Sequence, residues 1–243
     1  HGHVDALLAK AGSGVESLSL PDSAGIPDSY TMETVIARFN DIESAKQLIC
    51  ASHEDLAAVI VEPVCGNMGV IPPEPGFLKS LRDFTSRYGI VLIFDEVITG
   101  FRVARGGAQE RYGVIADLTC LGKILGGGFP VGAFGGHRDI MEYLAPVGPV
   151  YQAGTLSGNP VTVTAGITTL QALKGPDVYR ELEEKGRLLE EGLRGALSSG
   201  IQVTINRVGS MLTVFFGTDR VTVPDHARIC DRELFGRFFH GML

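Results

Sequence analysis

Two short stretches place chemically useful residues directly after buried apolar runs. Asp95 follows the run 91–94, and Lys123 follows the shorter run 118–121 and begins a glycine-rich turn. A lysine amine can form a Schiff base with an aldehyde, and a carboxylate can keep a pyridine nitrogen protonated so that the ring withdraws electrons. Each stretch alone is more typical of a strand, a turn and a solvated charge. Together they predict an enzyme that uses pyridoxal phosphate.

Alternating strands and helices must position these two residues. Such alternation is typical of an α/β fold whose sheet is largely parallel and carries helices on both faces. The expected elements are a helix over 41–56, a strand over 57–61, a helix over 75–88 ending at Gly89, and strands over 90–94, 118–121 and 131–134. Only residues 124–130 join the last two strands, whereas a parallel crossover needs about a dozen residues or more. We therefore predict a mixed, mostly parallel sheet with one reversed strand.

The alternation of strands and helices changes after Tyr151. Asn159 and Pro160 begin a helix that extends to about residue 173, because proline is favoured at the first helical position. A charged helix over 178–197 and strands over 202–206 and 211–216 follow, which is typical of a smaller α+β unit. We predict part of a large cofactor-binding domain over 1–175 and part of a small C-terminal domain over 176–243. The start at His1 and the end inside an amphipathic pattern predict an internal piece of a longer protein.

Composition excludes several classes of partner. The formal net charge of −7 argues against a nucleic-acid backbone or an anionic membrane as the main partner. No apolar run is long enough to cross a bilayer. The four cysteines lack CxxC pairing, so we expect reduced, buried thiols in a cytosol-like compartment and no metal site. The remaining expectation is a small-molecule substrate.

A third polar residue also ends a predicted strand. Glu62 follows the run 57–61 and precedes Pro63, which cannot continue a strand. Ligands of open α/β sheets bind beyond the carboxyl ends of the strands, so Glu62, Asp95 and Lys123 are expected to share one crevice. For Glu62, a solvated strand end explains the sequence equally well.

Two longer motifs resemble a known family. Residues 95–102 (DEVITGFR) and 121–130 (LGKILGGGFP) are similar to the signature of class III aminotransferases, which are fold type I pyridoxal-phosphate enzymes. The resemblance implies that Lys123 is the Schiff-base lysine and the proton shuttle, that Asp95 pairs with the pyridine nitrogen, and that Val97 packs against the ring. It also implies a cofactor that alternates between pyridoxal and pyridoxamine phosphate.

Residues 1–14, 20–27, 62–69 and 151–160 are similar to one branch of that family, the aminomutases, which move an amino group within one molecule through a diamine intermediate. This resemblance implies that Asn67 lies near the ring oxygen and that the Thr155 hydroxyl reaches the phosphate across the interface of a homodimer. Turn chemistry remains the alternative for Asn67, and an ordinary loop threonine for Thr155.

Three further features are weighed against plainer explanations. Residues 11–29 are rich in glycine, proline and serine and are expected to form a lid that excludes water, with a passive loop as the alternative. His1 and His3 are expected to pack or face solvent, not to bind metal. Residues 126–128 are expected to form a tight turn, not a phosphate-binding loop.

Two other functions remain open. A conventional class III aminotransferase acting on an ω-amino acid would share Asp95 and Lys123. A truncated chain could also act only as a binding or assembly module, because the resemblance implies that the phosphate cup and the arginine for the substrate carboxylate lie outside it. The expected compartment is the cytoplasm, or the plastid stroma in a photosynthetic eukaryote.

Overall fold

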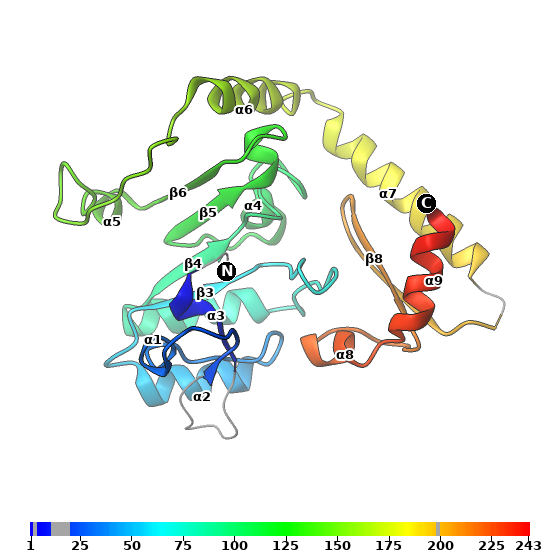
Figure 1. Cartoon of the computed structure of the whole chain (residues 1–243), viewed down its shortest axis with the longest axis horizontal. Coiled ribbons are helices and arrows are strands. Elements are labelled where there is room, and N and C mark those ends of the chain that lie inside the picture. The colour runs from blue at the N-terminus through cyan, green and yellow to red at the C-terminus, as the bar shows by residue number, and fades with distance from the viewer. Residues whose placement is uncertain (2–3, 11–19, 198–199) are drawn as a thin grey trace.

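A four-stranded sheet forms the centre of the computed structural model, which describes residues 1, 4–10, 20–197 and 200–243. The strands lie in the order β3 (Ala58–Val61), β4 (Val91–Asp95), β5 (Leu118–Gly122) and β6 (Gly132–Gly136). The first three run parallel, and β6 runs antiparallel to β5. The predicted mixed sheet with one reversed strand is therefore confirmed (Figure 1).

The core of this part forms where β4 meets helix α3 (Phe77–Tyr88). Leu92 and Phe94 of β4 are fully buried, and Phe77 and Leu81 of α3 pack in the same cluster. The helix ends at Gly89 as predicted, because φ there is +68°, a left-handed conformation that glycine adopts without strain. Burial of these aromatic and aliphatic side chains supplies the main driving force for this half of the fold.

Helix α2 (Ile42–Ser52) packs on α3 and starts where the sequence predicts. The Asp41 carboxylate accepts a hydrogen bond from the Ser44 amide at 2.9 Å, which caps the helix. The helix stops before residue 56, because the amides of Asp55 and Leu56 both bond to the Ser52 carbonyl in a closing turn.

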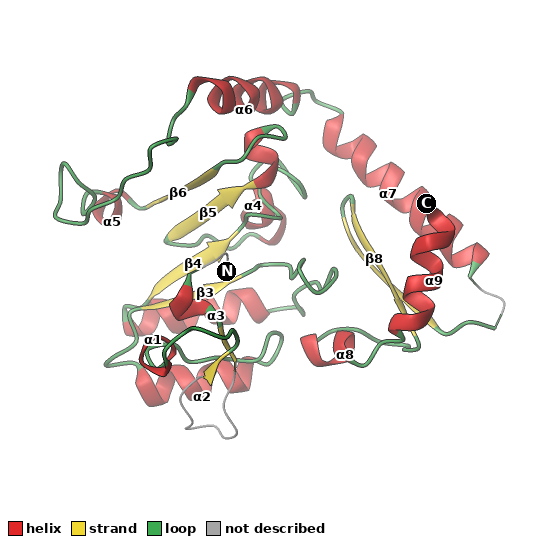
Figure 2. Ribbon diagram, viewed as in Figure 1, coloured by secondary structure: helices red, strands yellow, loops and turns green. Residues whose placement is uncertain are grey.

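Helix α6 (Pro160–Ala172) packs against the turn that contains Lys123, the 3₁₀ helix η2 (Lys123–Gly126). Before it, α5 (Arg138–Met141) and residues 142–159 extend away from the sheet (Figure 1). In the view of Figure 2, the sheet lies between α3 and α6. Between β4 and β5, the short helix α4 (Gly107–Tyr112) was not predicted.

The C-terminal part contains α7 (Val178–Ala196), the hairpin β7 (Val203–Val208) and β8 (Met211–Phe216), α8 (Pro224–Arg228) and α9 (Arg232–Met242). Ile205, Val214 and Phe216 form a cluster with α7 and α9 side chains. Phe215 and Val221 instead join the core of the main sheet. The elements match the predicted α+β unit, and the boundary near residue 175 stays a prediction.

The N-terminal segment contains η1 (Asp5–Leu7), the paired strands β1 (Ala9–Lys10) and β2 (Leu20–Pro21), and α1 (Asp28–Thr31). The predicted lid covers 11–29. Its residues 11–19 lie outside the described part, and β2 and the start of α1 occupy some of the remainder, so the lid stays a prediction.

Two expectations from composition can be compared with the structure. Within the described ranges, no helix is both long and apolar enough to cross a membrane. The four cysteines are free, as expected. The expectation that all four are buried is wrong: only Cys65 is buried, Cys120 and Cys230 are half-buried, and Cys50 is exposed on α2.

Candidate active site

Asp95 lies at the carboxyl end of β4, in the middle of the parallel part of the sheet. Its Oδ1 accepts a hydrogen bond from the Val97 amide at 3.1 Å. Its Oδ2 lies 2.8 Å from Nδ1 of His1, and the Asp95 side chain is only 13% exposed. Because a carboxylate only accepts, the His1 ring donates in this pair. Both carboxylate oxygens of Asp95 are therefore held in a fixed orientation.

Lys123 follows β5 directly and has an unusual backbone. Its φ is +45°, a left-handed conformation that is uncommon for a residue with a side chain and is concentrated at functional sites. The side chain is exposed, and among the described residues it has no hydrogen bond or ion pair. The amine is therefore available to a ligand.

Close packing of α6 supports this turn. A Cβ added at Gly166 of α6 would lie 2.5 Å from the Leu125 carbonyl oxygen, and one added at Gly127 would lie 2.8 Å from the Ala165 carbonyl oxygen. Only glycine permits such an approach of helix and turn. Gly127 and Gly128 both have positive φ values, which confirms the predicted tight turn.

Glu62 follows β3 and joins the same edge. Its Oε2 accepts a hydrogen bond from the Gly66 amide at 3.0 Å. Burial raises the pKa of the Glu62 carboxyl, and the negative charge of Asp95 adds to this effect, whereas the Gly66 amide and Lys123 oppose it. Glu62 therefore lies near enough to the other two strand-end residues for their charges to act on its carboxyl.

Val97 and Asn67 lie in the loops that follow β4 and β3. A Cβ added at Gly122 would lie 3.2 Å from Val97 Cγ1, so Val97 packs beside the residue that precedes Lys123. Asn67 is exposed in a turn closed by the bridge between Cys65 and Ile71. The structure therefore places Val97 just past the end of β4, beside the last residue of β5, and Asn67 in the neighbouring turn.

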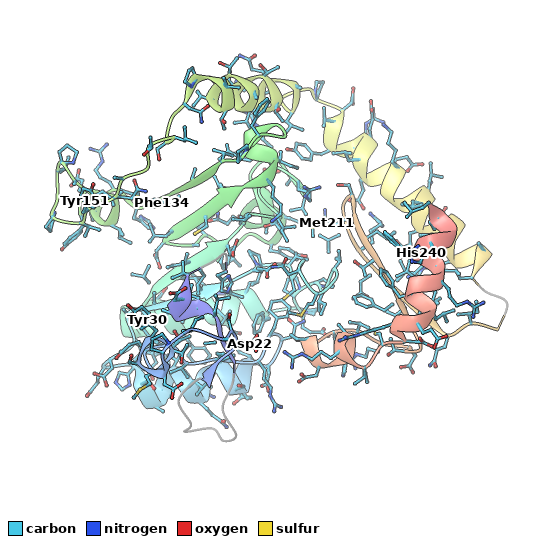
Figure 3. All side chains as sticks on the ribbon, viewed as in Figure 1. Asp22, Tyr30, Phe134, Tyr151, Met211 and His240 are labelled. Carbon is cyan, nitrogen blue, oxygen red and sulfur yellow. The ribbon has the colours of Figure 1, made fainter. Side chains whose placement is uncertain are left out.

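Thr155 lies apart from this group. It belongs to the exposed segment 151–158 before α6, and among the described residues it has no hydrogen bond. Figure 3 shows Tyr151, the first residue of that segment, lying away from the main sheet. The structure of one chain does not bring Thr155 to the crevice, so its role across a subunit interface stays a prediction.

Sequence reasoning missed the contact between His1 and Asp95. The two residues are 94 positions apart, and no periodicity connects them. His3 lies outside the described residues. Arg102 was also missed, although it lines a depression beside Lys123 together with Ile124, Gly128, Phe129 and Pro130. Its position in the motif 95–102 was the available signal.

Glu96, which follows β4, has a structural part in the site. It is 1% exposed, and its carboxylate accepts hydrogen bonds from the Thr99 hydroxyl at 2.9 Å, the Ala108 amide at 2.6 Å and the Gln109 side chain at 3.0 Å. A buried carboxylate is stable only with such partners. Through these hydrogen bonds, Glu96 connects α4 to the end of β4.

An α/β sheet with a fixed carboxylate and an accessible amine at adjacent strand ends is the arrangement of a fold type I pyridoxal-phosphate enzyme. The sequence profile of the class-III aminotransferase family matches residues 1–234, and the chain belongs to this family. It is 56% identical over 246 residues to a glutamate-1-semialdehyde 2,1-aminomutase of Pelotomaculum thermopropionicum and 55% identical over 244 residues to glutamate-1-semialdehyde 2,1-aminomutase 2 of Brevibacillus brevis. These alignments cover 100% of this chain but 56% and 57% of the relatives, so the chain spans about half of their length.

Solved structures show the same similarity. An omega-transaminase from Sphaerobacter thermophilus superimposes with a TM-score of 0.80 at 38% identity, over 87% of this chain and 48% of that one. A glutamate-1-semialdehyde aminomutase from Pseudomonas aeruginosa, in complex with PMP, also gives a TM-score of 0.80, at 26% identity over 95% of this chain and 53% of that one. The predicted fold class and family are confirmed.

Proposed function

We propose that the native protein containing this chain is a pyridoxal-phosphate-dependent aminomutase. It converts (S)-4-amino-5-oxopentanoate (glutamate 1-semialdehyde) into 5-aminolevulinate, a precursor of tetrapyrroles such as haem and chlorophyll. The observation that carries this proposal is the identity of 55–56% over the whole chain to relatives with that name. The positions of Asp95 and Lys123 at adjacent strand ends support it.

The residues of the site fit pyridoxal or pyridoxamine phosphate. Asp95 offers a half-buried carboxylate for a positively charged ring nitrogen, and Lys123 offers a primary amine without a competing partner among the described residues. When bound, the cofactor supplies an electron-withdrawing ring that stabilises negative charge on a neighbouring carbon. The P. aeruginosa relative is described as a complex with PMP.

Each residue then has a defined task. Asp95 Oδ2, oriented by His1, holds the ring nitrogen proton. Lys123 Nζ accepts and returns protons at the substrate carbons, a general acid–base role. Val97 packs against one face of the ring. Asn67 donates a hydrogen bond near the ring oxygen, and Glu62 supports the Asn67 turn through its bond to Gly66.

An aminomutase must retain the diamine 4,5-diaminovalerate between its two half-reactions. Retention requires that the site close and exclude water, and residues 11–29 are the proposed lid. An aminotransferase instead releases a keto product and admits a second substrate. The two functions therefore differ in whether a keto acid must be added.

The test is turnover of glutamate 1-semialdehyde by the native protein without any keto acid. Continuous formation of 5-aminolevulinate is the expected result. Product formation that stops after a single turnover and resumes only when a keto acid is added would instead assign a conventional ω-amino-acid aminotransferase. An omega-transaminase is also a structural relative, but at 38% identity it is less similar than the aminomutases of Pelotomaculum and Brevibacillus. Absence of both activities, with no cofactor absorbance, would leave a binding or assembly module.

We also propose a homodimer with Thr155 at its interface, in the cytoplasm or, in a photosynthetic eukaryote, the plastid stroma. Exposed apolar side chains on the segment around Thr155 support an interface there. Tyr151 is 84% exposed, Leu156 76% and Val147 77%, and water contacts them in the single chain. Sedimentation of the native protein as a monomer across a range of concentrations would contradict the dimer.

A further inference from the structure

The turn that carries Asn67 is held from the C-terminal part of the chain. Both backbone groups of Val70 bond to side chains of the β7–β8 hairpin. The Val70 amide donates to Thr213 Oγ1 at 3.0 Å, and Asn206 Nδ2 donates to the Val70 carbonyl at 2.9 Å. Asn206 and Thr213 face each other across the hairpin. One cross-strand pair of the hairpin therefore holds both backbone polar groups of one residue of the turn.

Apolar packing adds to these hydrogen bonds between the hairpin and the turn. Gly69 has a φ of +96°, and a Cβ added there would lie 2.6 Å from Cζ of Phe215, so the hairpin lies directly on the turn. Met211, labelled in Figure 3 near the tip of the hairpin, packs in one buried cluster with Val70 and Val103. Val103 belongs to the loop that follows β4. The hairpin thus covers the loops after both β3 and β4.

The other end of the turn is held by the candidate site itself. Glu62 accepts the hydrogen bond of the Gly66 amide, and a Cβ added at Gly66 would lie 2.5 Å from Ile98 Cδ1. Asn67 lies between these two attachments, exposed and, among the described residues, without a side-chain partner. Its position therefore depends on both ends of the turn.

We propose that Asn206 and Thr213 are positioning residues for Asn67. They fix the backbone of Val70 on both sides of its Cα. The Val70 backbone fixes the turn, and the turn sets where the Asn67 amide meets the cofactor. The last step rests on the proposed function. The coupling between hairpin and turn rests only on the hydrogen bonds and the packing.

The coupling is tested by amide hydrogen exchange in the cofactor-free native protein. Thr213→Val keeps the shape but removes the acceptor, so the Val70 amide and its neighbours in 66–71 should exchange at least about tenfold faster. Thr213→Ser should restore slow exchange. Thr204→Val is the matched control, because Thr204 lies on the same hairpin and its hydroxyl donates to the Thr218 carbonyl, just after β8, and not to the turn. Unchanged exchange in Thr213→Val would overturn the proposal.

The effect on the site is tested by the absorbance of added pyridoxal phosphate as a function of pH. Asn67→Ala should shift the midpoint of the spectral change, and Thr213→Val and Asn206→Leu should shift it in the same direction. The double variant Asn67→Ala with Thr213→Val should shift it no further than Asn67→Ala alone, since both changes act through one group. Asn206→Leu gives an independent result if Thr213→Val fails to fold.

The outcomes distinguish failure of the positioning role of Asn206 and Thr213 from failure of the proposed function. A shift in Asn67→Ala but none in the Thr213 and Asn206 variants refutes their positioning role and leaves the proposed function intact. No cofactor absorbance in the unsubstituted protein refutes the proposed function. Faster amide exchange in Thr213→Val would in that case still show that the hairpin stabilises the turn. Unchanged exchange would show that it does not.

Discussion

At the scale of single residues, Lys123 combines an accessible amine with a left-handed backbone. We predict that Lys123→Ala lowers the turnover of the native protein by about 10²- to 10⁴-fold, because the group proposed to move protons is lost. The absorbance that the lysine produces with added pyridoxal phosphate should disappear as well. The measurement is a steady-state assay together with a cofactor titration.

Lys174→Ala is the control for this prediction. Lys174 is exposed in the turn just after α6 and follows no strand, so its loss should leave turnover within about twofold. Equal activity of Lys123→Ala and the unsubstituted protein would remove Lys123 from the proposed chemistry.

The strand-end residues could be predicted because each follows an apolar run, and parallel strands deliver their carboxyl ends to one edge. Asn67 and Thr155 could be proposed only through the family resemblance, since a turn asparagine and a loop threonine have no pattern of their own. The pairing of His1 with Asp95 could not be predicted. It depends on how the N-terminal segment folds over the sheet.

At the scale of elements, the contact between α6 and η2 positions Lys123. Gly166→Ala places a methyl carbon only 2.5 Å from the Leu125 carbonyl oxygen, which is too close, so helix and turn must separate. We predict a loss of about 1–3 kcal/mol in the free energy of unfolding and a weaker reaction of Lys123 with cofactor. Urea unfolding and cofactor titration measure the two effects.

Gly192→Ala provides the matched helical control. Gly192 lies inside α7, and an added Cβ would meet nothing within 4 Å. The substitution should stabilise the protein by about 0.4–1 kcal/mol, because alanine loses less backbone entropy on folding. If both variants behave alike, close packing at Gly166 does not control the turn.

The buried carboxylate of Glu96 stabilises a second element, helix α4. We predict that Glu96→Ala lowers the free energy of unfolding by about 2–4 kcal/mol, because the Ala108 amide and the Gln109 side chain lose a buried acceptor. Glu110→Ala removes an exposed carboxylate that accepts the Gly106 amide and should cost about 1 kcal/mol or less. Urea unfolding of both variants compares them, and equal losses would contradict the prediction.

The same network explains why α4 was not predicted. Helix α4 has only six residues, too few to show helical periodicity. Its start is stabilised by Glu96, more than ten positions earlier in the chain. By contrast, α3 and α7 have long amphipathic patterns, and the reversed β6 follows from the short connection after Lys123. Local patterns could therefore be predicted, whereas hydrogen bonds between distant residues could not.

At the scale of the whole molecule, two carboxyls make stability depend on pH in opposite ways. Burial raises the pKa of Glu62, so the folded state binds that proton more tightly than the unfolded state. Stability is therefore lost as pH rises from the ordinary value of 4.5 through the folded pKa. We predict that Glu62→Gln gains stability over the unsubstituted protein as pH rises from about 4 to about 7.

Glu183 supplies the control of opposite sign. Its hydrogen bond from Arg207 lowers the pKa of the Glu183 carboxyl, so its contribution is present above 4.5 and is lost as pH falls through the folded pKa. Glu183→Gln should therefore be less stable near pH 7, with the difference shrinking towards low pH. Urea midpoints across this range measure both variants. Parallel pH profiles for the two would contradict the assigned signs.

Strand β6 has a practical consequence for work on this chain. Among the described residues it pairs only with β5, and its Phe134 side chain is 47% exposed. An open strand edge with apolar neighbours is a template on which a second molecule can add a strand. Preparations of the chain by itself should therefore self-associate as concentration rises. Light scattering over a dilution series would separate such strand addition from the proposed homodimer.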